Sequence, residues 1–388
     1  MDDFRKANVF KIGEICDKIH SGGTPSTRYK EEYYGGNIPW LRSGEINFNS
    51  ITNTETFITE FAIKNSSAKW IRNKSVLIAL TGATVARTCV NEISLTANQS
   101  CCALETNESI INYKYLYYYL ASKYFEIKGM AQGALTSLNL DLIKKIIVPV
   151  PKIKVQEEIV KILDSFTNLI DALNEEQSLR QKQFEYYREK LLTFDDKSVY
   201  TTLGKVGKFT RGNGLQKKDF TEYGFPCIHY GQIHTSYNTS TFSTISYCSK
   251  SLAKKLKKAK YGDLLIATTS EDVDACCKAI AWLGEGEVAY SGDSYCFSHN
   301  ENPKYMAYLF QSNMFYNQKK TSATGAKVIR VSGDSMSQFI LPIPSLAIQQ
   351  SIVEKLDAFE SLISSLKEEV ALRQKQYEYY REKLLTFN

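Results

Sequence analysis

Two stretches of the chain place hydrophobic side chains at alternating intervals of four and three residues. The first occupies residues 159–194 and the second residues 352–387. This spacing is typical of the seam of a coiled coil, in which one face of a long helix is buried against a partner helix. At ~1.5 Å per residue, a helix of about forty residues is roughly 60 Å long, which exceeds the needs of one domain core. We expect the two helices to pack antiparallel on each other within the chain.

The chain ahead of each long helix has a different pattern. Short runs of β-branched and apolar residues predict strands, and loops rich in Gly, Ser, Thr and Asn separate them. The predicted strands include residues 75–80, 146–150, 263–268 and 339–343. Aromatic helical segments are predicted at residues 113–124 and 305–316. Each half is therefore expected to form a mixed α/β domain of the α+β class.

The two halves are copies of one another. Residues 179–194 read LRQKQFEYYREKLLTF and residues 372–387 read LRQKQYEYYREKLLTF, so sixteen residues recur with one Phe to Tyr change at a separation of 193 residues. A repeat of half the chain indicates two equivalent modules, related by a pseudo-twofold axis if the helices are antiparallel. The predicted division is a first domain at 1–151, a first helix at 152–196, a second domain at 197–344 and a second helix at 345–388.

A polar position interrupts each predicted seam near its middle. Arg180 and Arg373 occupy positions of the four-three pattern that are otherwise mostly apolar. Two buried guanidinium groups near a twofold axis would repel each other unless carboxylates met them. The sequence therefore predicts that each arginine pairs with a glutamate of the other helix. The candidate partners are Glu175 and Glu176 for Arg373, and Glu368 and Glu369 for Arg180.

Composition and charge restrict the kinds of partner and the location that we expect for the chain. The formal net charge of +6 permits a polyanionic partner without requiring one. Residues 249–260 carry six lysines broken by leucines, which fits either a solvated surface or a turn of helix whose cationic face contacts phosphates. No run of eighteen apolar residues is present, and the first residues lack the basic-then-apolar pattern of an export signal, so we expect a cytoplasmic protein.

The sequence lacks recognisable motifs for catalysis or metal binding. It has no GxxxxGK[ST] phosphate loop or G-x-S-x-G turn, and Asn302-Pro303 is best explained as a helix start. The four histidines do not form a ligand cluster. Among nine cysteines, Cys101-Cys102 and Cys276-Cys277 are adjacent pairs, but neighbouring residues in a strand point to opposite faces, so buried free thiols are expected. We expect a chain that is not itself an enzyme and binds no cofactor.

Several segments make the chain resemble the DNA-specificity subunit of type I restriction-modification enzymes. In the first half they are IGEICDKIHSGGTPST (12–27) and YYGGNIPWLRSGEI (33–46). In the second half they are RGNGLQKKDF (211–220), GFPCIHYGQIHT (224–235), YGDLLIATTSED (261–272) and RVSGD (330–334). Both halves then end on similar strand-to-helix junctions, IIVPVPKIKVQEEIVKILD and FILPIPSLAIQQSIVEKLD. The junctions depart from the Pro-Pro of many relatives, because Lys152 follows Pro151 and Ser345 follows Pro344.

This resemblance implies two target recognition domains, each reading one half of a split, asymmetric site in double-stranded DNA. It also implies an assembly with two methyltransferase subunits, packed on the helices, and two ATP-dependent restriction subunits. S-adenosylmethionine, ATP and magnesium would belong to those partners, which carry out adenine methylation or restriction. A helix of ~60 Å matches about eighteen base pairs of ~3.4 Å rise, so helix length would set the unread gap.

Candidate DNA contacts follow from chemistry, since base reading needs paired donors or acceptors and phosphate contacts need cations on loops. In the first half they are Thr24, Ser26, Thr27, Arg28, Lys30, Arg42, Ser43, Thr81, Thr84, Arg87, Asn98, Gln99, Thr136 and Ser137. In the second half they are Arg211, Asn213, Gln216, Lys217, Lys218, His229, Tyr230, Gln232, His234, Thr268, Thr269, Ser270, Lys327 and Arg330. The candidate contacts to partner subunits are Phe184, Tyr187, Arg188, Tyr377, Tyr380 and Arg381.

Two other functions fit the same sequence. A stand-alone DNA-binding regulator would bind a split operator tightly without partner enzymes. A scaffold would bind proteins through its helices and no nucleic acid through its domains. Capture of a methyltransferase partner, followed by mapping of methylated adenines, separates these three functions.

Overall fold

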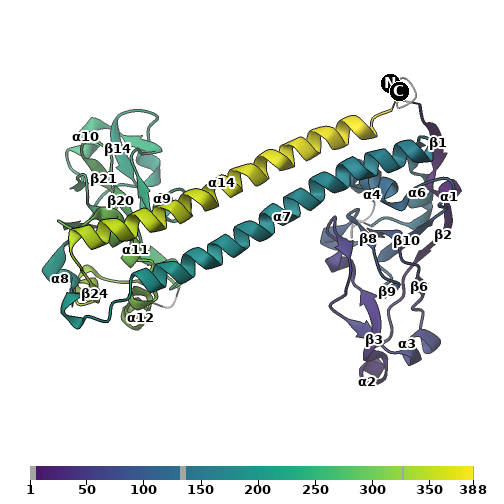
Figure 1. Ribbon diagram of the computed structural model, residues 1–388, viewed down its shortest axis with the longest axis horizontal. Helices are drawn as coiled ribbons and strands as arrows, with labels where there is room; N and C mark the ends of the chain where they lie inside the picture. Colours follow the sequence, from purple (N-terminus) through teal and green to yellow (C-terminus); the bar gives the residue numbers. More distant parts are fainter. Residues whose placement is uncertain (1–5, 132–136, 326, 388) are drawn as a thin grey trace. The chain divides into compact units, whose positions relative to one another are not determined.

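The computed structural model describes residues 6–131, 137–325 and 327–387, and the chain divides into two compact units. Unit 1 contains residues 1–174 and 368–388, and unit 2 contains residues 175–367. Each unit combines one α+β domain with parts of both long helices, α7 (Ile153–Leu191) and α14 (Leu346–Leu385) (Figure 1). The long helices predicted from the four-three pattern are confirmed.

The domain of unit 1 is built on a five-stranded sheet with the strand order β2-β10-β7-β8-β4. Its central strand reads SVLIA and is buried at every position, because both faces of the sheet are covered. Val76 and Ile78 pack with helix α4, whereas Leu77 and Ala79 pack towards a second sheet of order β5-β3-β9-β6. The strands are β2 (Cys16–Ser21), β3 (Tyr34–Leu41), β4 (Ser50–Ile51), β5 (Phe57–Ile58), β6 (Trp70–Ile71), β7 (Ser75–Ala79), β8 (Thr88–Asn91), β9 (Leu95–Ala97) and β10 (Cys101–Thr106).

Short helices and one small sheet complete the domain of unit 1. The helices are α1 (Ile12–Ile15), α2 (Lys30–Tyr33), α3 (Glu60–Asn65), α4 (Tyr113–Ser122), α5 (Tyr124–Gly129) and α6 (Leu140–Lys145). Strand β1 (Asn8–Lys11) pairs with β11 (Ile147–Val150), which leads into α7. The predicted aromatic helix at 113–124 is present as α4 and ends two residues earlier, with Asn112 as its N-cap.

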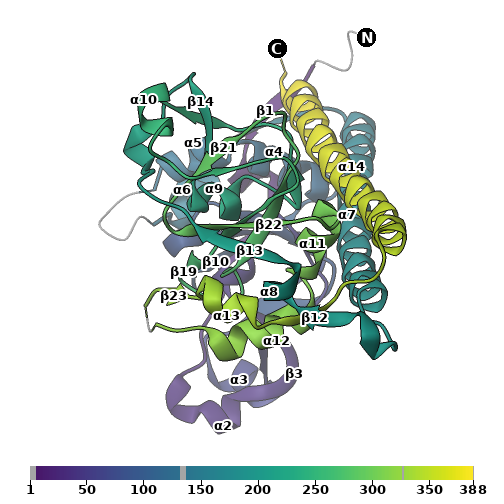
Figure 2. The same ribbon diagram turned by 90° about the vertical axis from the view of Figure 1, so that its left-hand side faces the viewer.

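The domain of unit 2, which faces the viewer in Figure 2, repeats this topology. Its sheets have the orders β13-β22-β18-β20-β15 and β16-β14-β21-β17, which match the two sheets of unit 1 strand for strand. The strands are β12 (Tyr200–Thr202), β13 (Gly207–Arg211), β14 (Phe225–Ile228), β15 (Ser240–Thr241), β16 (Ser246–Cys248), β17 (Lys258–Ala259), β18 (Leu264–Ala267), β19 (Thr269–Ser270), β20 (Lys278–Trp282), β21 (Val288–Tyr290), β22 (Ser294–His299), β23 (Ile329–Arg330) and β24 (Ile340–Pro342). The helices are α8 (Leu203–Val206), α9 (Tyr230–Thr235), α10 (Lys250–Ala253), α11 (Pro303–Leu309), α12 (Asn313–Ser322) and α13 (Gly333–Ser337). The expected pair of α+β domains is confirmed.

Each domain is joined to its long helix by the same hydrogen bonds. In unit 1 the buried side chain of Gln156 accepts from the Asn112 backbone N–H at 2.8 Å. Asp164 accepts from Lys114 Nζ at 2.8 Å and from the Tyr118 hydroxyl at 2.7 Å. The corresponding residues in unit 2 are Gln349, Asn302, Asp357, Lys304 and Tyr308, with distances of 2.9, 2.6 and 2.8 Å. Because buried polar groups need partners, these contacts fix where each domain meets its helix.

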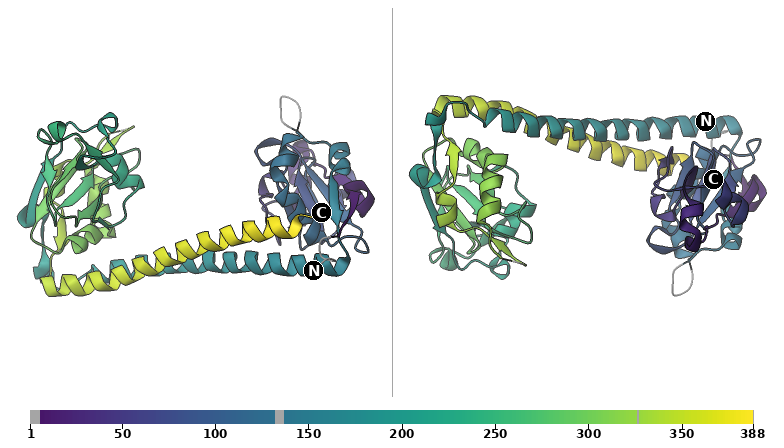
Figure 3. Two further views of the ribbon diagram at one scale, coloured as in Figure 1. Left: turned by 90° about the horizontal axis from the view of Figure 1, so that it is seen from above. Right: turned by 90° about the horizontal axis from the view of Figure 1, so that it is seen from below.

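Aromatic pairs show that helices α7 and α14 run in opposite directions. In unit 1, Phe166 of α7 stacks on Tyr380 of α14 with ring centroids 5.4 Å apart. In unit 2, Tyr187 of α7 stacks on Phe359 of α14 at the same distance. The contact therefore moves forward by 21 residues on one helix and back by 21 residues on the other. This register is that of the expected antiparallel intramolecular coiled coil (Figure 3).

The polar positions of the seam are paired differently from the prediction. Arg180 pairs with Glu176 of its own helix at 3.3 Å, and Arg373 pairs with Glu369 of its own helix at 2.7 Å. The two arginine side chains keep 40% and 37% of their surface exposed. A guanidinium group that reaches water does not require a charge from the facing helix, so a glutamate one turn earlier is sufficient.

Candidate nucleic-acid interface

In unit 1, four segments that carry predicted DNA contacts are tied together by hydrogen bonds to backbone carbonyls. Gly22 N donates to the Cys101 carbonyl at 3.0 Å, which brings the loop after β2 against the loop 97–101. Asn98 N donates to the Leu41 carbonyl at 2.9 Å, next to the loop 42–45. The hydroxyl of Thr84 donates to the Ser43 carbonyl at 3.0 Å, which adds the loop 81–87. A Cβ on Gly22 would lie 2.2 Å from a backbone oxygen, so this close approach requires glycine.

The basic side chains of this unit 1 surface differ in whether they form ion pairs or hydrogen bonds within the chain. Arg42 pairs with Glu45 at 3.8 Å and also with Glu55. Arg87 Nη1 donates to the Asn47 side chain at 2.9 Å. Arg28 and Lys30 are exposed, and no ion pair to either is found in the described part of unit 1. The charges of Arg28 and Lys30 are therefore not offset by any carboxylate described in unit 1.

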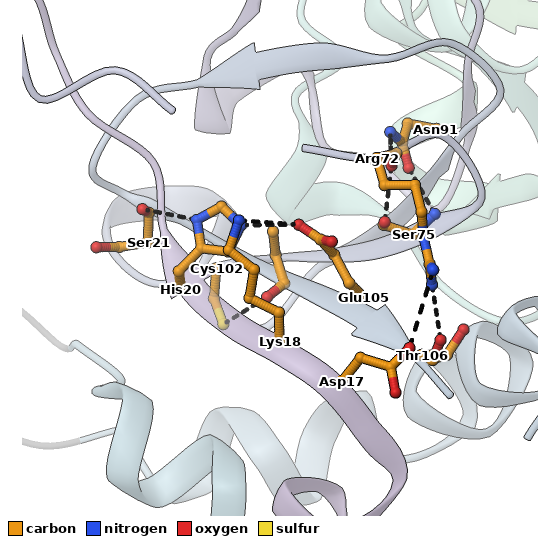
Figure 4. A network of polar contacts seen from close by, with 11 residues as sticks. Asp17, Lys18, His20, Ser21, Arg72, Ser75, Asn91, Cys102, Glu105 and Thr106 are labelled. Atoms are coloured by element: carbon orange, nitrogen blue, oxygen red, sulfur yellow. Dashed lines mark hydrogen bonds and ion pairs between the residues drawn. The ribbon is translucent and has the colours of Figure 1, made fainter. Parts of the chain in front are cut away.

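A polar network that the sequence analysis missed lies along the edge strand β2 (Figure 4). Glu105 accepts from His20 Nε2 at 3.1 Å and lies 3.6 Å from Lys18 Nζ. Arg72 donates to the Thr106 carbonyl at 2.7 Å. Charged side chains on an edge strand discourage pairing with another chain. No local pattern could reveal this network, because the pairing of β2 with β10 brings together residues that are 85 positions apart.

In unit 2, predicted residues gather around the turn at 291–293. Arg211 Nε donates to a carbonyl of this turn at 3.0 Å, and Tyr230 N donates to the Ser291 hydroxyl at 2.9 Å. The Thr269 hydroxyl lies 3.5 Å from the Asp293 carboxylate. The sequence analysis missed Asp293, although a carboxylate is the side chain that accepts from the amino group of cytosine. The turn thus gathers donors and an acceptor from three separate loops.

Aromatic and imidazole rings lie beside this turn. The ring of Tyr230 has its centroid 4.5 Å from that of His229 and 6.3 Å from that of His234. Burial, with a contribution from Lys217, lowers the pKa of His229, so its imidazole is neutral near pH 7. The Gln232 amide is engaged within the domain, since it accepts from the His229 N–H at 2.9 Å and donates to a serine hydroxyl at 2.7 Å. A neutral His229 offers hydrogen bonds rather than a cation.

The lysine-rich segment lies against the predicted DNA-binding loop 211–218. The side chain of Asn213 donates to the Lys255 carbonyl at 2.9 Å and accepts from the Lys257 N–H at 2.7 Å. Leu215 and Leu256 share a buried cluster beneath this contact. Two basic segments separated by about forty residues therefore form one surface, and Asn213 is the residue that joins them.

The lysine-rich segment contains a turn of helix, which is one of the two forms expected from its spacing. Helix α10 is a single turn, and the chain then enters the short strand β17. The side chains of Lys254, Lys255 and Lys257 are exposed, and none has an ion-pair partner among the residues described for unit 2. Lys258 differs, because it pairs with Glu287 at 3.4 Å.

The remaining predicted contacts of unit 2 occupy two loops. Gln216, Lys217 and Lys218 are exposed on the loop 211–218. Arg330 lies on β23, which pairs with β19 so that Arg330 faces Thr269. Lys327 is exposed just before this strand. In unit 1, the predicted contact Thr136 lies outside the described residues.

Four of the predicted partner contacts are engaged within the chain. Phe184 and Tyr377 are 5% and 8% exposed and pack into the cores of unit 2 and unit 1 respectively. Arg188 lies over the Phe184 ring at 5.7 Å, and Arg381 lies over the Tyr377 ring at 5.2 Å. These aromatic and basic positions of the repeat thus have a role in holding each helix to a domain.

Tyrosines of the same repeat remain available on the helix surface. Tyr187 and Tyr380 stack at the seam and keep 36% and 41% of their surface exposed. Their neighbours Tyr186 and Tyr379, which the sequence analysis did not select, are 61% and 58% exposed. Exposed tyrosines at equivalent positions are typical of a surface that binds another protein.

Within the described residues, no group of three or more His, Cys, Asp or Glu side chains is placed to hold a metal ion. None of the helices in residues 6–131, 137–325 and 327–387 combines the length and the apolar character that a bilayer crossing demands.

Comparisons with known proteins agree with this architecture. The family profile described as "Type I restriction modification DNA specificity domain" matches residues 5–181 and again residues 196–372. A putative type I restriction enzyme specificity subunit of Haemophilus influenzae is 32% identical over 298 residues, covering 72% of this chain and 73% of the relative. The EcoR124I/EcoR124II specificity subunit of Escherichia coli is 31% identical over 258 residues, covering 63% of each.

A solved structure is similar over nearly the whole chain. The S subunit of a type I restriction-modification system from M. genitalium superposes with a TM-score of 0.58 at 14% sequence identity, covering 97% of this chain and 96% of that one. At this identity the likeness shows a shared fold.

Proposed function

Because the chain belongs to the family of type I restriction-modification DNA specificity subunits, we propose that its two domains read the two halves of a split DNA site. As a specificity subunit, the chain selects DNA and is not itself the catalyst. The observation that carries the proposal is the convergence, in each domain, of separate loops bearing hydrogen-bonding side chains and exposed cations.

We assign different roles to the two kinds of side chain. In unit 2, Asp293 belongs to the turn at 291–293, Tyr230 is bonded to this turn and His234 lies beside Tyr230, and we assign these three side chains to base edges. The exposed lysines beside them contact phosphates without sequence preference. These lysines are Lys217, Lys218, Lys254, Lys255 and Lys257. In unit 1, Asn98 and Gln99 take the base-reading role, while Arg28 and Lys30 contact phosphates.

We propose that the chain acts in an assembly with catalytic partner subunits. Two methyltransferase subunits pack on the helices through the exposed tyrosines 186, 187, 379 and 380, and two ATP-dependent restriction subunits join them. S-adenosylmethionine, ATP and magnesium are held by those partners, which methylate adenine or cut DNA at sites that this chain selects. We place the assembly in the cytoplasm, and we keep the division into domains at 1–151 and 197–344 with helices at 152–196 and 345–388.

Modified-base sequencing tests the proposed function directly. DNA from cells with and without this chain is compared for methylated adenine. We expect a split sequence motif that is methylated only when the chain is present. Unchanged methylation, together with tight specific binding by the isolated chain, would instead favour a stand-alone regulator.

A salt titration tests the assignment of the lysines. Replacing Lys217 and Lys218 by Ala should weaken binding to all DNA sequences and reduce the slope of log K against log salt by about 2, since each phosphate contact contributes ~0.9. Replacing exposed Lys355 of α14 by Ala is the matched control and should leave the slope unchanged. Changes at Gln216, Gln232 or His234 should alter base preference instead. An unchanged slope for the lysine pair would contradict the assignment.

A further inference from the structure

The adjacent cysteines of unit 2 have an unusual geometry. The Sγ atoms of Cys276 and Cys277 lie 3.8 Å apart. Cys277 has a φ of +62°, in the left-handed region that residues other than glycine rarely adopt. The pair directly precedes β20, so the alternation of a strand does not separate the two thiols.

The chain contains a matched pair without this geometry. Cys101 and Cys102 are also adjacent, but they lie inside the regular strand β10. Cys102 packs in the cluster that includes helix α4, and Cys101 packs in the cluster on the opposite face of the sheet. The same dipeptide is therefore split between two faces in unit 1 and brought together in unit 2.

A buried lysine adjoins the thiols of unit 2. Lys319 of α12 is 5% exposed, and its Nζ donates to the carbonyls of Asp274 and Cys276 at 3.0 and 2.8 Å. No carboxylate described in unit 2 lies within ion-pair distance of this ammonium. The hydrogen bond from the Cys277 thiol and the charge of Lys319 lower the pKa of Cys276. The pKa of every other cysteine is raised, in most cases chiefly by burial, so Cys276 is the thiol whose surroundings favour the thiolate once solvent reaches it.

The pair is linked to the proposed DNA-reading loops. Cys276 Sγ lies 3.4 Å from the Thr268 carbonyl and 3.9 Å from the Ile329 carbonyl. Thr268 directly precedes β19 and Ile329 belongs to β23, the two paired strands that carry Thr269 and Arg330. A change in the position of this sulfur would therefore act on both strands.

We propose that Cys276 and Cys277 are an oxidation-sensitive dithiol, which closes to a disulfide with a two-electron thiol oxidant and so disturbs the DNA-reading loops of unit 2. The effect on DNA binding rests on the proposed function, whereas formation of the disulfide does not. The sulfurs must approach from 3.8 Å to about 2.05 Å, and conversion of the Cys276 thiol to a disulfide removes its S–H donor from the Thr268 and Ile329 carbonyls. Cys276 and Cys277 are 0% and 1% exposed, so an oxidant reaches them when the mostly exposed residues 271–274 open locally.

The chemistry balances with an azo oxidant such as diamide. The Cys276 thiolate adds to one nitrogen of the N=N bond, and the other nitrogen takes up a proton. The Cys277 sulfur then attacks Cys276 Sγ, loses its proton and expels the reduced compound, which takes up that proton. Two thiols are oxidised to one S–S bond, and the azo bond is reduced to a hydrazine by two electrons and two protons.

Peptide mass mapping of the full-length chain tests the disulfide. The reduced protein is treated with diamide, the remaining thiols are alkylated, and the peptides are analysed. The peptide containing Cys276 and Cys277 should be lighter by two hydrogens and unalkylated, while Cys101 and Cys102 should both be alkylated after unfolding. Oxidation of the two adjacent pairs to the same extent would overturn the proposal. A disulfide formed first between Cys227 and Cys248, whose thiols also interact, would overturn it too.

DNA binding tests the consequence of the disulfide. Diamide should weaken binding to the specific site by at least about tenfold, equivalent to the loss of one base contact. The Cys276→Ser variant should resist this loss, and a Cys101→Ser, Cys102→Ser variant should remain as sensitive as the native chain. A disulfide that leaves binding unchanged would overturn the switch, whereas absence of specific binding by the reduced chain would count against the proposed function.

A second measurement needs no variant. Iodoacetamide labelling of the native chain across pH should reach Cys276 at lower pH than any other cysteine. The charged groups around it are Lys319, Asp272 and Asp274, together with the Cys277 thiol. Labelling of Cys276 that is as slow as that of Cys102 would contradict the proposed reactivity.

Discussion

At the residue scale, Asp164 and Asp357 make the same contacts in the two units. Each accepts from a lysine ammonium and from a tyrosine hydroxyl of its own domain. The aspartate side chains are 26% and 33% exposed, so solvent weakens the charge interaction without removing it. Each aspartate thus holds a domain to its long helix.

Replacing either aspartate by Asn should loosen that junction. We expect Asp164→Asn and Asp357→Asn each to lower the free energy of unfolding by about 1 kcal/mol. Each substitution removes the negative charge that accepts hydrogen bonds from a lysine ammonium and a tyrosine hydroxyl. Urea unfolding measures the change. Glu158→Gln, at an exposed position of α7, is the control and should have no measurable effect. Equal unfolding curves for all three variants would contradict this role.

His299 gives the stability a pH dependence. Burial lowers its pKa to about 4, although the carboxylate of Asp263 acts in the opposite direction. In the unfolded chain the imidazole of this histidine is protonated as the pH falls through about 6.5. The stability contributed by neutral His299 is therefore complete above about pH 6.5 and is lost as the pH falls towards 4.

The His299→Asn variant should remove this part of the pH dependence. Between pH 7.5 and pH 5 we expect the native chain to lose about 1–2 kcal/mol more unfolding free energy than the variant does. Chemical unfolding at the two pH values measures the difference. The interpretation fails if both chains lose the same amount.

The backbone conformation of single residues was the feature that the sequence predicted least well. The alternation rule placed adjacent cysteines on opposite faces, which holds for Cys101 and Cys102 inside a strand. It fails for Cys276 and Cys277, because the left-handed φ of Cys277 turns the chain just before β20. A backbone conformation of this kind has no signature in residue type when the residue is not glycine.

At the element scale, the seam of the long helices contains equivalent aromatic stacks. Phe166 and Phe359 occupy the same position in the two copies of the repeat. Leu169 and Leu362, one turn later, are 41% and 40% exposed. The four-three pattern predicted the seam correctly, because burial of one face is a property that helical spacing records directly.

Truncation of the two phenylalanines should have equal effects. We expect Phe166→Ala and Phe359→Ala each to lower the free energy of unfolding by about 1–2 kcal/mol. This loss is smaller than that for a fully buried ring, because both stacks reach solvent. Leu169→Ala and Leu362→Ala are the matched controls and should cost less than about 0.5 kcal/mol. Thermal unfolding compares them. A large loss for the leucines and none for the phenylalanines would show that a different face is buried.

Elements that depend on distant partners were harder to predict. The leucine spacing of the lysine-rich segment indicated a turn of helix, which is present as α10, but it did not predict the strand β17 that follows, whose backbone pairs with β21. The polar positions Arg180 and Arg373 were expected to be buried, but each reaches water and pairs within its own helix. The missing information was the distant strand partner for the lysine-rich segment and the local exposure for the arginines, neither of which spacing encodes.

At the scale of the whole molecule, the internal repeat was the most reliable guide. It predicted two copies of one fold, and the sheets of the two domains have the same strand order. Gln156 and Gln349, which occupy equivalent positions of the repeat, make the same hydrogen bond in the two units. The bases that are read did not follow from the repeat, since the loops that differ between the domains are the ones that carry the candidate contacts.

The length of the helices should set the spacing of the DNA site. Removing seven residues from the middle of both α7 and α14 keeps the seam in register and shortens each helix by about 10 Å, or roughly three base pairs. We expect the methylated half-sites to keep their sequences while the gap between them shortens. A gap of unchanged length would contradict this relation.

The most direct measurement of the central claim is modified-base sequencing with variants confined to one domain. Tyr230→Ala with His234→Ala in unit 2 should change the methylated motif in one half of the site only. Asn98→Ala with Gln99→Ala in unit 1 should change only the other half. If either pair changes both halves together, or if the motif proves to be one continuous sequence, the two domains do not read separate half-sites.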